Sequence, residues 1–317
     1  MATAGANMSG NRKHFDISQL PSLKDGMTVK EESDKRRKTC RFIEEAGRVL
    51  KLPRVAVATA MVFFHRFYAK HSFSEHDRFE VAVACLVLAA KTEESPKKLN
   101  IVIDECYKLK VRGMQAGRIS QPVGAATPSP ATNTGNLDPK GEEFLKLKER
   151  ILLLERVILH TIGFELSIDH PYKFMVEQIK KMVQKRQLEY IKPVEGATAQ
   201  IYGKMMNEMV QYAMNFANDS MHTSLCLQFE PHKIATACVY LAGHFAKVRP
   251  VNKQTWLDVL GPCDVESLAS ISMQVVELIT ERKGVNDGTF EAIRQDLDVL
   301  NKKPEDDGPD AKRQRRE

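Results

Sequence analysis

The sequence lacks any apolar run near the roughly 18 residues that a membrane-spanning helix requires. Residues 1–11 also lack the apolar core of a secretory signal. We therefore expect an intracellular protein that makes no membrane contact. The six cysteines form no CxxC pair, which argues against a zinc ribbon or finger. Reduced, buried thiols are expected instead, as is usual in a reducing compartment.

Signatures of catalysis and of ligand binding are also missing. The chain has no phosphate-binding loop, no Ser/His/Asp set and no Cys/His pair, and its nine histidines are scattered. The net charge of +6 is modest, and no basic run is interleaved with aromatic residues as in proteins that bind single-stranded nucleic acid. We expect no enzymatic activity, no metal or other cofactor, and no direct contact with nucleic acid.

What the chain does contain is a short apolar segment that occurs twice. Residues 82–90, AVACLVLAA, return as residues 235–243, ATACVYLAG. Each copy is apolar almost all round, which indicates a helix enclosed on every side, and its small residues let neighbouring helices approach closely. The repeat predicts two helical domains, each with its own central helix. The first copy ends on Lys91 and the second on His244, which suggests that one domain makes a contact that the other lacks.

Helical periodicity dominates the chain and no hairpin signal is present, so we predict an all-α fold of two tandem five-helix bundles. The first bundle is expected at residues 29–166, with a flexible, proline-broken insertion at 111–140, and the second at 167–283. Residues 1–28 are expected to be a flexible extension. Residues 284–317 are expected to be a charged tail with one short helix near 290–300.

Two helix starts are marked by proline within the first bundle. Ser95 followed by Pro96 predicts a capped helix that ends near Lys108. Asp138 followed by Pro139 predicts the start of the next helix, whose acidic first turn complements the helix dipole.

Several segments follow one another in the order found in a known family. These segments are residues 21–26, 64–68, 89–98, 169–172 and 224–231. Together they resemble the transcription-type cyclins (cyclins T, K and L) over roughly residues 20–282. The resemblance implies that both bundles are cyclin boxes. It also implies that the chain is a nuclear, activating subunit of a cyclin-dependent kinase that phosphorylates the C-terminal domain of RNA polymerase II.

The same resemblance assigns a kinase-binding surface to the first bundle. Lys91 and Glu155 match the paired charged residues that bind the kinase, and Phe164 matches an apolar contact position. Glu93 and Glu94 lie at the edge of the same surface. From the residues alone, a lysine at a helix end also complements the helix dipole, and an acid within an apolar run also pairs locally. A Lys and a Glu set in apolar surface nevertheless suit the backbone groups of a partner helix.

The chain departs from the cell-cycle members of this family at two places. Those members carry an Asp at the position of His65 and pair it with an Arg that matches Arg36, so that internal salt bridge is expected to be lost or replaced. Their apolar substrate-docking patch corresponds to the basic residues 35–39 of this chain. We expect no docking of Arg-x-Leu motifs, because a polar surface offers no apolar groove.

Two accessory features lie in segments without apolar periodicity. Thr127 and Ser129 each precede a proline and are candidates for proline-directed phosphorylation, within what is otherwise an ordinary linker. The basic C-terminal residues suit a nuclear import signal, although such tails also serve as solubilising ends. The residues of this candidate signal are Lys312, Arg313, Arg315 and Arg316.

Other functions are compatible with two helical bundles. A general transcription factor of the TFIIB type binds promoter DNA with two cyclin-like folds, but it normally carries an amino-terminal zinc ribbon, and no cysteine precedes Cys40 here. A helical scaffold without a kinase partner has no use for a charged pair on the first bundle only. Within the family, a splicing-linked role of the cyclin L type stays open beside the elongation role of cyclins T and K.

Overall fold

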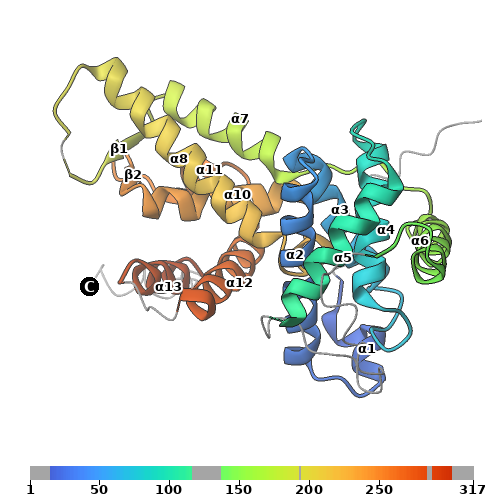
Figure 1. Cartoon of the computed structure of the whole chain (residues 1–317). Helices are drawn as coiled ribbons and strands as arrows, with labels where there is room; N and C mark the ends of the chain where they lie inside the picture. The colour runs from blue at the N-terminus through green and yellow to red at the C-terminus, as the bar shows by residue number, and fades with distance from the viewer. Residues whose placement is uncertain (1–14, 116–136, 193, 284–287, 302–317) are drawn as a thin grey trace, which may run out of the picture. The chain divides into compact units, whose positions relative to one another are not determined.

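The computed structural model describes residues 15–115, 137–192, 194–283 and 288–301. Within these residues the regular secondary structure is almost entirely helical (Figure 1), which confirms the predicted all-α fold. It forms two compact units. The first contains the residues up to His170 together with Ser220–Glu230, and the second contains Pro171–Asp219 and the residues from Pro231 onward. None of the helices in the described part of the chain combines the length and the apolar character needed to cross a bilayer.

The first unit is built around α4 (Arg78–Thr92), which carries the first copy of the repeat. The Asp77 carboxylate begins this helix by accepting the N–H groups of its first turn. Every residue from Val81 to Ala90 is buried, which confirms the prediction of an enclosed central helix. Figure 1 shows the four helices that surround it: α2 (Val29–Val49), α3 (Arg54–Phe67), α5 (Leu99–Gln115) and α6 (Glu142–Thr161).

The second unit repeats this plan around α10 (Pro231–Phe245), whose residues from Ala237 to Gly243 are buried. Gly243 shows why the repeat needs small residues, because a Cβ atom there would collide with the indole of Trp256. The rings of Tyr212 and Phe216 on α8 (Thr198–Ser220) pack on Phe245. The other helices around α10 are α7 (Pro171–Gln184), α11 (Trp256–Leu260), α12 (Val265–Lys283) and α13 (Gly288–Asn301).

The second unit also contains a small antiparallel ribbon that the sequence did not predict. β1 (Leu188–Tyr190) pairs with β2 (Val248–Pro250), with Leu188 opposite Pro250 and Tyr190 opposite Val248. Each strand has only three residues, and α8, α9 (Leu225–Gln228) and α10 separate the two in the chain. Neither an alternating pattern nor a turn motif therefore marks this pairing in the sequence.

The described part of the predicted N-terminal extension is folded rather than flexible. It contains a 3₁₀ turn, η1 (Ile17–Gln19), and a short helix, α1 (Pro21–Lys24). Both are anchored on the first unit, because Leu20 is buried and the buried hydroxyl of Ser22 accepts the N–H of Phe73. This anchoring depends on residues far apart in the chain, which is why local composition did not reveal it.

Three helix limits also differ from those predicted. α5 begins at Leu99 rather than at Pro96, and it continues to Gln115, past the expected end near Lys108 and into the predicted insertion. α6 begins at Glu142 rather than at Pro139, because the Asp138 carboxylate caps a preceding turn through the N–H of Lys140. The short helix expected near the C-terminus is α13, which buries Phe290, Ile293 and Leu297.

The interior of the first unit holds a buried arginine. Arg36 is 1% exposed and donates to Glu32 Oε1 at 2.6 Å, to His65 Nδ1 at 3.2 Å and to the carbonyl oxygens of His65 and Tyr68. In cell-cycle cyclins, the arginine at the position of Arg36 forms a salt bridge with an aspartate at the position of His65. Here that salt bridge is replaced by one between Arg36 and Glu32 within α2. Because arginine can only donate, His65 Nδ1 accepts, and the protonated Nε2 donates to the carbonyl oxygen of Met221 at 3.0 Å.

This arrangement keeps His65 neutral and makes the fold sensitive to acid. Burial, and secondly the charge of Arg36, lower the pKa of His65 to about 3. An unfolded histidine titrates at about 6.5. Between these two values the unfolded chain binds one more proton than the folded chain, so falling pH lowers the free energy of unfolding by about 1.4 kcal/mol per pH unit. Above the upper value the contribution is constant.

We expect His65→Gln to remove this part of the acid sensitivity. Glutamine can accept from Arg36 or donate to the Met221 carbonyl, but it does not titrate. Urea unfolding of both proteins between about pH 5 and pH 6 should give a slope that is shallower in the variant by about 1.4 kcal/mol per pH unit. Equal slopes for the two proteins would show that His65 is not the group responsible.

Candidate functional site

The central helix of the first unit reaches the surface at Lys91, the first residue after its buried segment. Lys91 Nζ lies 2.5 Å from Glu155 Oε1 on α6. The lysine side chain is 54% exposed, whereas the glutamate side chain is only 11% exposed. Because Glu155 accepts one of the three N–H groups of the ammonium, the other two can face a partner. The structure thus brings together the two charges that the sequence paired.

This ion pair lies beside apolar surface. Leu152 is three residues before Glu155 and therefore on the same face of α6, and its side chain is exposed. An ion pair with one largely exposed member contributes only about 0–1 kcal/mol to stability. The pair therefore adds little to the fold, whereas its two charges hold each other in a fixed position at the surface.

Phe164 is a large apolar side chain that is held outward. α6 ends at Thr161, and the chain then turns through Gly163 and Phe164, whose φ angles are 65° and 59°. The left-handed conformation is unusual for an aromatic residue, and the N–H of Phe164 is fixed by a bond to the Leu159 carbonyl. Phe164 is 59% exposed, and its ring lies nearly perpendicular to the His160 ring, with the centroids 5.3 Å apart. The turn therefore holds Phe164 at the surface, where its side chain can contact a partner, rather than in the core.

Glu93 and Glu94 follow α4 and have different environments. Glu94 is exposed, with a φ angle of 51°. Glu93 is half-buried, and its Oε1 accepts the hydroxyl of Thr59 at 2.7 Å. His170 Nε2 lies 2.8 Å from the same hydroxyl oxygen. Since Thr59 donates to Glu93, it must accept from His170, so the imidazole carries its proton on Nε2.

The hydrogen-bonded chain from His170 through Thr59 to Glu93 ties the end of α4 to α3 and to the last residue before α7. Burial lowers the pKa of His170, which favours the neutral ring that this chain requires. The sequence did not point to Thr59 as a partner of Glu93, because a threonine inside an apolar helix carries no signal of the residue that it meets. His170 stood out only as part of a family motif.

The corresponding end of α10, in the second unit, is covered by neighbouring side chains. His244 occupies the position that Lys91 has in the repeat, but its side chain is 19% exposed and lies 3.4 Å from Asp296 on α13. The His244 ring also packs on Tyr240 and Trp256. A hydrogen bond from His244 lowers the pKa of Asp296, which keeps that carboxylate charged. Of the two repeat ends, the one at Lys91 is open to a partner.

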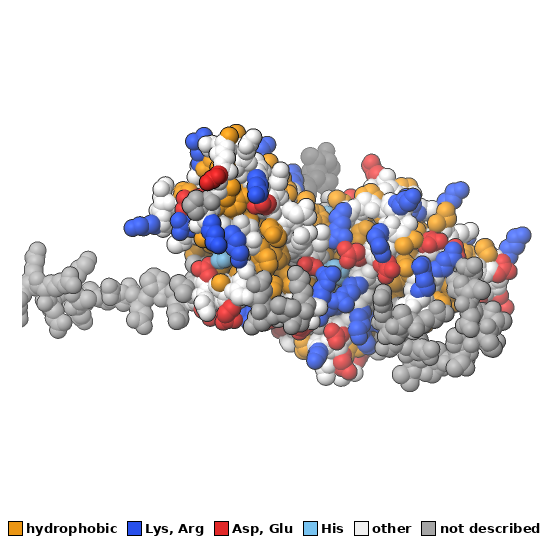
Figure 2. All heavy atoms as spheres, turned by 60° about the vertical axis from the view of Figure 1, so that its left-hand side comes forward, with side chains coloured by type: hydrophobic (Ala, Val, Ile, Leu, Met, Phe, Trp, Pro, Cys, Tyr) orange, Lys and Arg blue, Asp and Glu red, His pale blue; other side chains and the backbone are white. Residues whose placement is uncertain are grey.

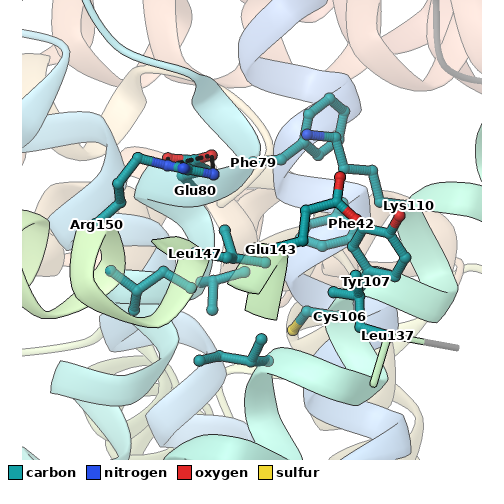
Figure 3. A pocket seen from close by; sticks show the side chains of 13 residues that line it. Phe42, Phe79, Glu80, Cys106, Tyr107, Lys110, Leu137, Glu143, Leu147 and Arg150 are labelled. Carbon is teal, nitrogen blue, oxygen red and sulfur yellow. Dashed lines mark hydrogen bonds and ion pairs between the residues drawn. The ribbon is translucent and has the colours of Figure 1, made fainter. Parts of the chain in front are cut away.

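A pocket of about 120 Å³ lies near the other end of α4 (Figure 3). Its lining is mainly apolar and includes Phe42 and Phe79, and Arg150 closes one side by pairing with Glu80 at 2.9 Å. Neither the candidate kinase-binding residues nor residues 35–39 line this pocket. The expected absence of Arg-x-Leu docking at residues 35–39 stays a prediction.

The charged surface is mixed. On the face that Figure 2 draws, Lys and Arg side chains are interspersed with Asp and Glu, as in an ordinary solvated surface. The two candidate phosphorylation sites, Thr127 and Ser129, lie outside the described residues, and so do the import residues Lys312, Arg313, Arg315 and Arg316.

Comparisons with known proteins agree with this architecture. The profile of the cyclin N-terminal domain matches residues 11–167. The chain is 35% identical over 283 residues to cyclin-T1-3 of Oryza sativa subsp. japonica, covering 88% of this chain and 49% of the relative. It is 32% identical over 275 residues to human cyclin-K, with coverage of 84% and 40%. It is 31% identical over 267 residues to human cyclin-L1, with coverage of 84% and 44%.

A solved structure shares the fold at lower identity. The chain matches a chain in the crystal structure of the yeast RNA Pol II CTD kinase CTDK-1 complex with a TM-score of 0.58 and 16% identity, covering 92% of this chain and 89% of that one. The chain spans about half or less of the length of the three relatives named above. With the tandem helical units and the profile match, these findings show that the chain belongs to the cyclin family. Its relatives place it with the transcription-type cyclins T, K and L.

We expect Thr59→Val to destabilise the first unit. The substitution keeps the shape of the side chain but leaves His170 without its acceptor and Glu93 without its donor, and such a loss costs about 1–3 kcal/mol. Thr59→Ser keeps the hydroxyl and loses only a methyl group, so it should cost less, about 1 kcal/mol. Thermal unfolding of the three proteins checks this order. A valine variant as stable as the serine variant would contradict the inferred hydrogen-bonded chain.

Proposed function

We propose that this chain is the activating regulatory subunit of a transcription-class cyclin-dependent kinase and performs no chemistry itself. Its two cyclin boxes would be residues 29–166 and 167–283. The observation that carries the proposal is the open end of α4, where Lys91 and Glu155 form a pair beside exposed apolar surface. The second unit closes the same position with Asp296 and Trp256. The first unit is therefore the one that is built to receive a partner.

The proposed binding surface is formed by Lys91, Glu93, Glu94, Glu155 and Phe164. Lys91 would donate to carbonyl oxygens at the end of a partner helix, and Glu155 would accept N–H groups from the adjoining segment. Phe164 would supply an apolar anchor, since aromatic residues are enriched among the contacts that dominate interface energies. The exposed turn places this ring in solvent until a partner covers it.

Activation would be a shift in population. A surface that binds only the active arrangement of the kinase favours that state by its differential affinity. Moving an equilibrium from 1:99 to 99:1 needs about 5.5 kcal/mol, which an interface of about 1,600 Å² with a few buried anchors can supply. The preformed ion pair reduces the ordering that such binding requires.

The proposed substrate of the kinase is the C-terminal domain of RNA polymerase II, and the proposed location is the nucleus. The relatives named cyclin-T and cyclin-K support a role in transcription. The yeast complex that contains a chain of this fold is an RNA Pol II CTD kinase. A splicing-linked role is the second candidate, because human cyclin-L1 is similar over the same part of the chain.

We expect Lys91→Glu and Glu155→Lys each to weaken kinase binding by at least about 30-fold. Removing one member of a buried charge pair at an interface costs about 2–5 kcal/mol, because the opposing group is left unpaired. The measurement is recovery of kinase with the tagged, purified chain, followed by the activity of that kinase on polymerase repeat peptides. Full recovery of active kinase with both variants would remove these residues from the proposal.

Two controls separate binding from folding. The double variant Lys91→Glu/Glu155→Lys restores an internal ion pair in reverse, so it should unfold like the original chain and still fail to recover the kinase. Lys146→Glu alters an exposed ion pair on α6, where Lys146 and Glu142 lie 2.7 Å apart, and it should leave kinase recovery unchanged. Recovery of kinase by the double variant would show that the pair acts only within the chain.

We also propose that the C-terminal basic residues direct nuclear import, and that Thr127 and Ser129 are phosphorylated. Replacing Arg313, Arg315 and Arg316 by alanine in a chain fused to a fluorescent reporter should move the reporter toward the cytoplasm. The measure is the nuclear-to-cytoplasmic fluorescence ratio, and an unchanged ratio would contradict the import role. A control with alanine at Lys173, Lys180 and Lys181, three exposed lysines of α7, keeps the loss of charge equal.

A further inference from the structure

Three potential metal ligands lie together in the connection between α3 and α4 of the first unit. They are His71, Glu75 and His76, and one ligating atom from each lies within 4.8 Å of the others. The spacing of these three residues in the sequence matches no recognised metal-binding motif. The sequence therefore offers no reason to predict a metal site here. The cluster takes no part in the proposed contact with a kinase.

The hydrogen bonds of His71 decide which of its nitrogens carries a lone pair. His71 Nε2 lies 3.0 Å from the hydroxyl of Thr161. That hydroxyl already donates to the carbonyl oxygen of Val157 at 2.8 Å, so it must accept the proton of Nε2. In the neutral ring, Nδ1 is then unprotonated, and it faces Glu75 Oε2 at 3.6 Å. Two electron-rich atoms that face each other at this distance favour a cation between them.

The ligands are held in place by the surrounding structure. The His71 ring stacks on Phe67, with the ring centroids 4.4 Å apart. Glu75 Oε2 accepts the N–H of Ser72 at 3.0 Å. The backbone of His76 is anchored because its carbonyl oxygen accepts the hydroxyl of Tyr68. A metal-ligating histidine usually donates its second N–H to a fixed acceptor, and Thr161 supplies that acceptor here.

We propose that His71 Nδ1, a Glu75 carboxylate oxygen and a ring nitrogen of His76 bind one Zn²⁺ ion, with water in the remaining position. Two imidazoles and a carboxylate are a ligand set that zinc takes, at about 2.0–2.2 Å from each atom. Two ligands at those lengths on a tetrahedral ion are about 3.4 Å apart. The 3.6 Å between His71 Nδ1 and Glu75 Oε2 is close to this value, and a ligating nitrogen of His76 lies within 4.8 Å of both.

Zinc at this site would fasten the connection between α3 and α4 to the last turn of α6. His71 bonds to Thr161 in that turn, and Lys70 Nζ donates to the Thr161 carbonyl at 2.6 Å. The turn that exposes Phe164 follows directly. The ion would therefore hold these two segments together, and its binding does not depend on the presence of a kinase.

Isothermal titration of the chelator-stripped full chain with ZnCl₂ at neutral pH tests the proposal. We expect one ion per chain, and binding at least about tenfold weaker in each of His71→Ala, Glu75→Gln and His76→Ala. Thr161→Val, which removes only the acceptor of the His71 proton, should weaken binding about tenfold. Co²⁺ in place of zinc should give the visible absorption of a four-coordinate ion, and that absorption should be lost in His71→Ala.

His232→Ala is the matched control, because it removes an exposed histidine from the second unit. This variant should bind zinc like the original chain. Circular dichroism confirms that each variant is folded. The proposal is overturned if the original chain takes up no zinc, or if zinc binds equally well to all three ligand variants, which would place the ion on other groups such as the thiols.

Discussion

The enclosure of α4 is the constraint on which the first unit depends. From Val81 to Ala90 this helix presents no polar side chain, so it is stable only when other helices cover all its faces. Four helices meet this requirement by packing around it. The helix becomes polar only where the enclosed segment ends. Lys91 is the first residue beyond the apolar segment, and it emerges where α6 supplies Glu155. The geometry of the candidate site thus follows from the burial of the helix that carries it.

Polar groups inside the first unit link segments that the apolar core alone would leave independent. Arg36 ties α2 to α3 through His65, and His65 in turn donates to the carbonyl of Met221. That bond is part of why Ser220–Glu230 belongs to the first compact unit although it follows α8 in the chain. The His170–Thr59–Glu93 chain acts in the same way at the candidate site. A buried donor or acceptor without its partner costs more than the bond contributes, so these contacts specify one arrangement.

The two copies of the repeat show how one helical plan can give an open and a closed helix end. At Lys91 the neighbouring acid belongs to the surrounding bundle and leaves the lysine exposed. At His244 the additional helix α13 and the indole of Trp256 cover the position. The ion pair at Lys91 contributes little to folding, because water screens its exposed member. The same pair gains importance once a partner removes that water, which is the physical basis of the proposed function.

The two central helices, the all-helical class and the position of Lys91 follow from the amino-acid sequence alone, because an apolar segment repeated at helical spacing has few stable environments. It also placed Glu155 and Phe164 through family resemblance. The folded chain was needed to reveal the anchoring of Leu20, the ribbon of β1 and β2, and the hydrogen bonds of Thr59. Each joins residues that are distant in the chain, and side chains that meet in space leave no periodic signal in either segment. The cluster of His71, Glu75 and His76 belongs with these features, since the hydroxyl of Thr161, far along the chain, decides which nitrogen of His71 is available.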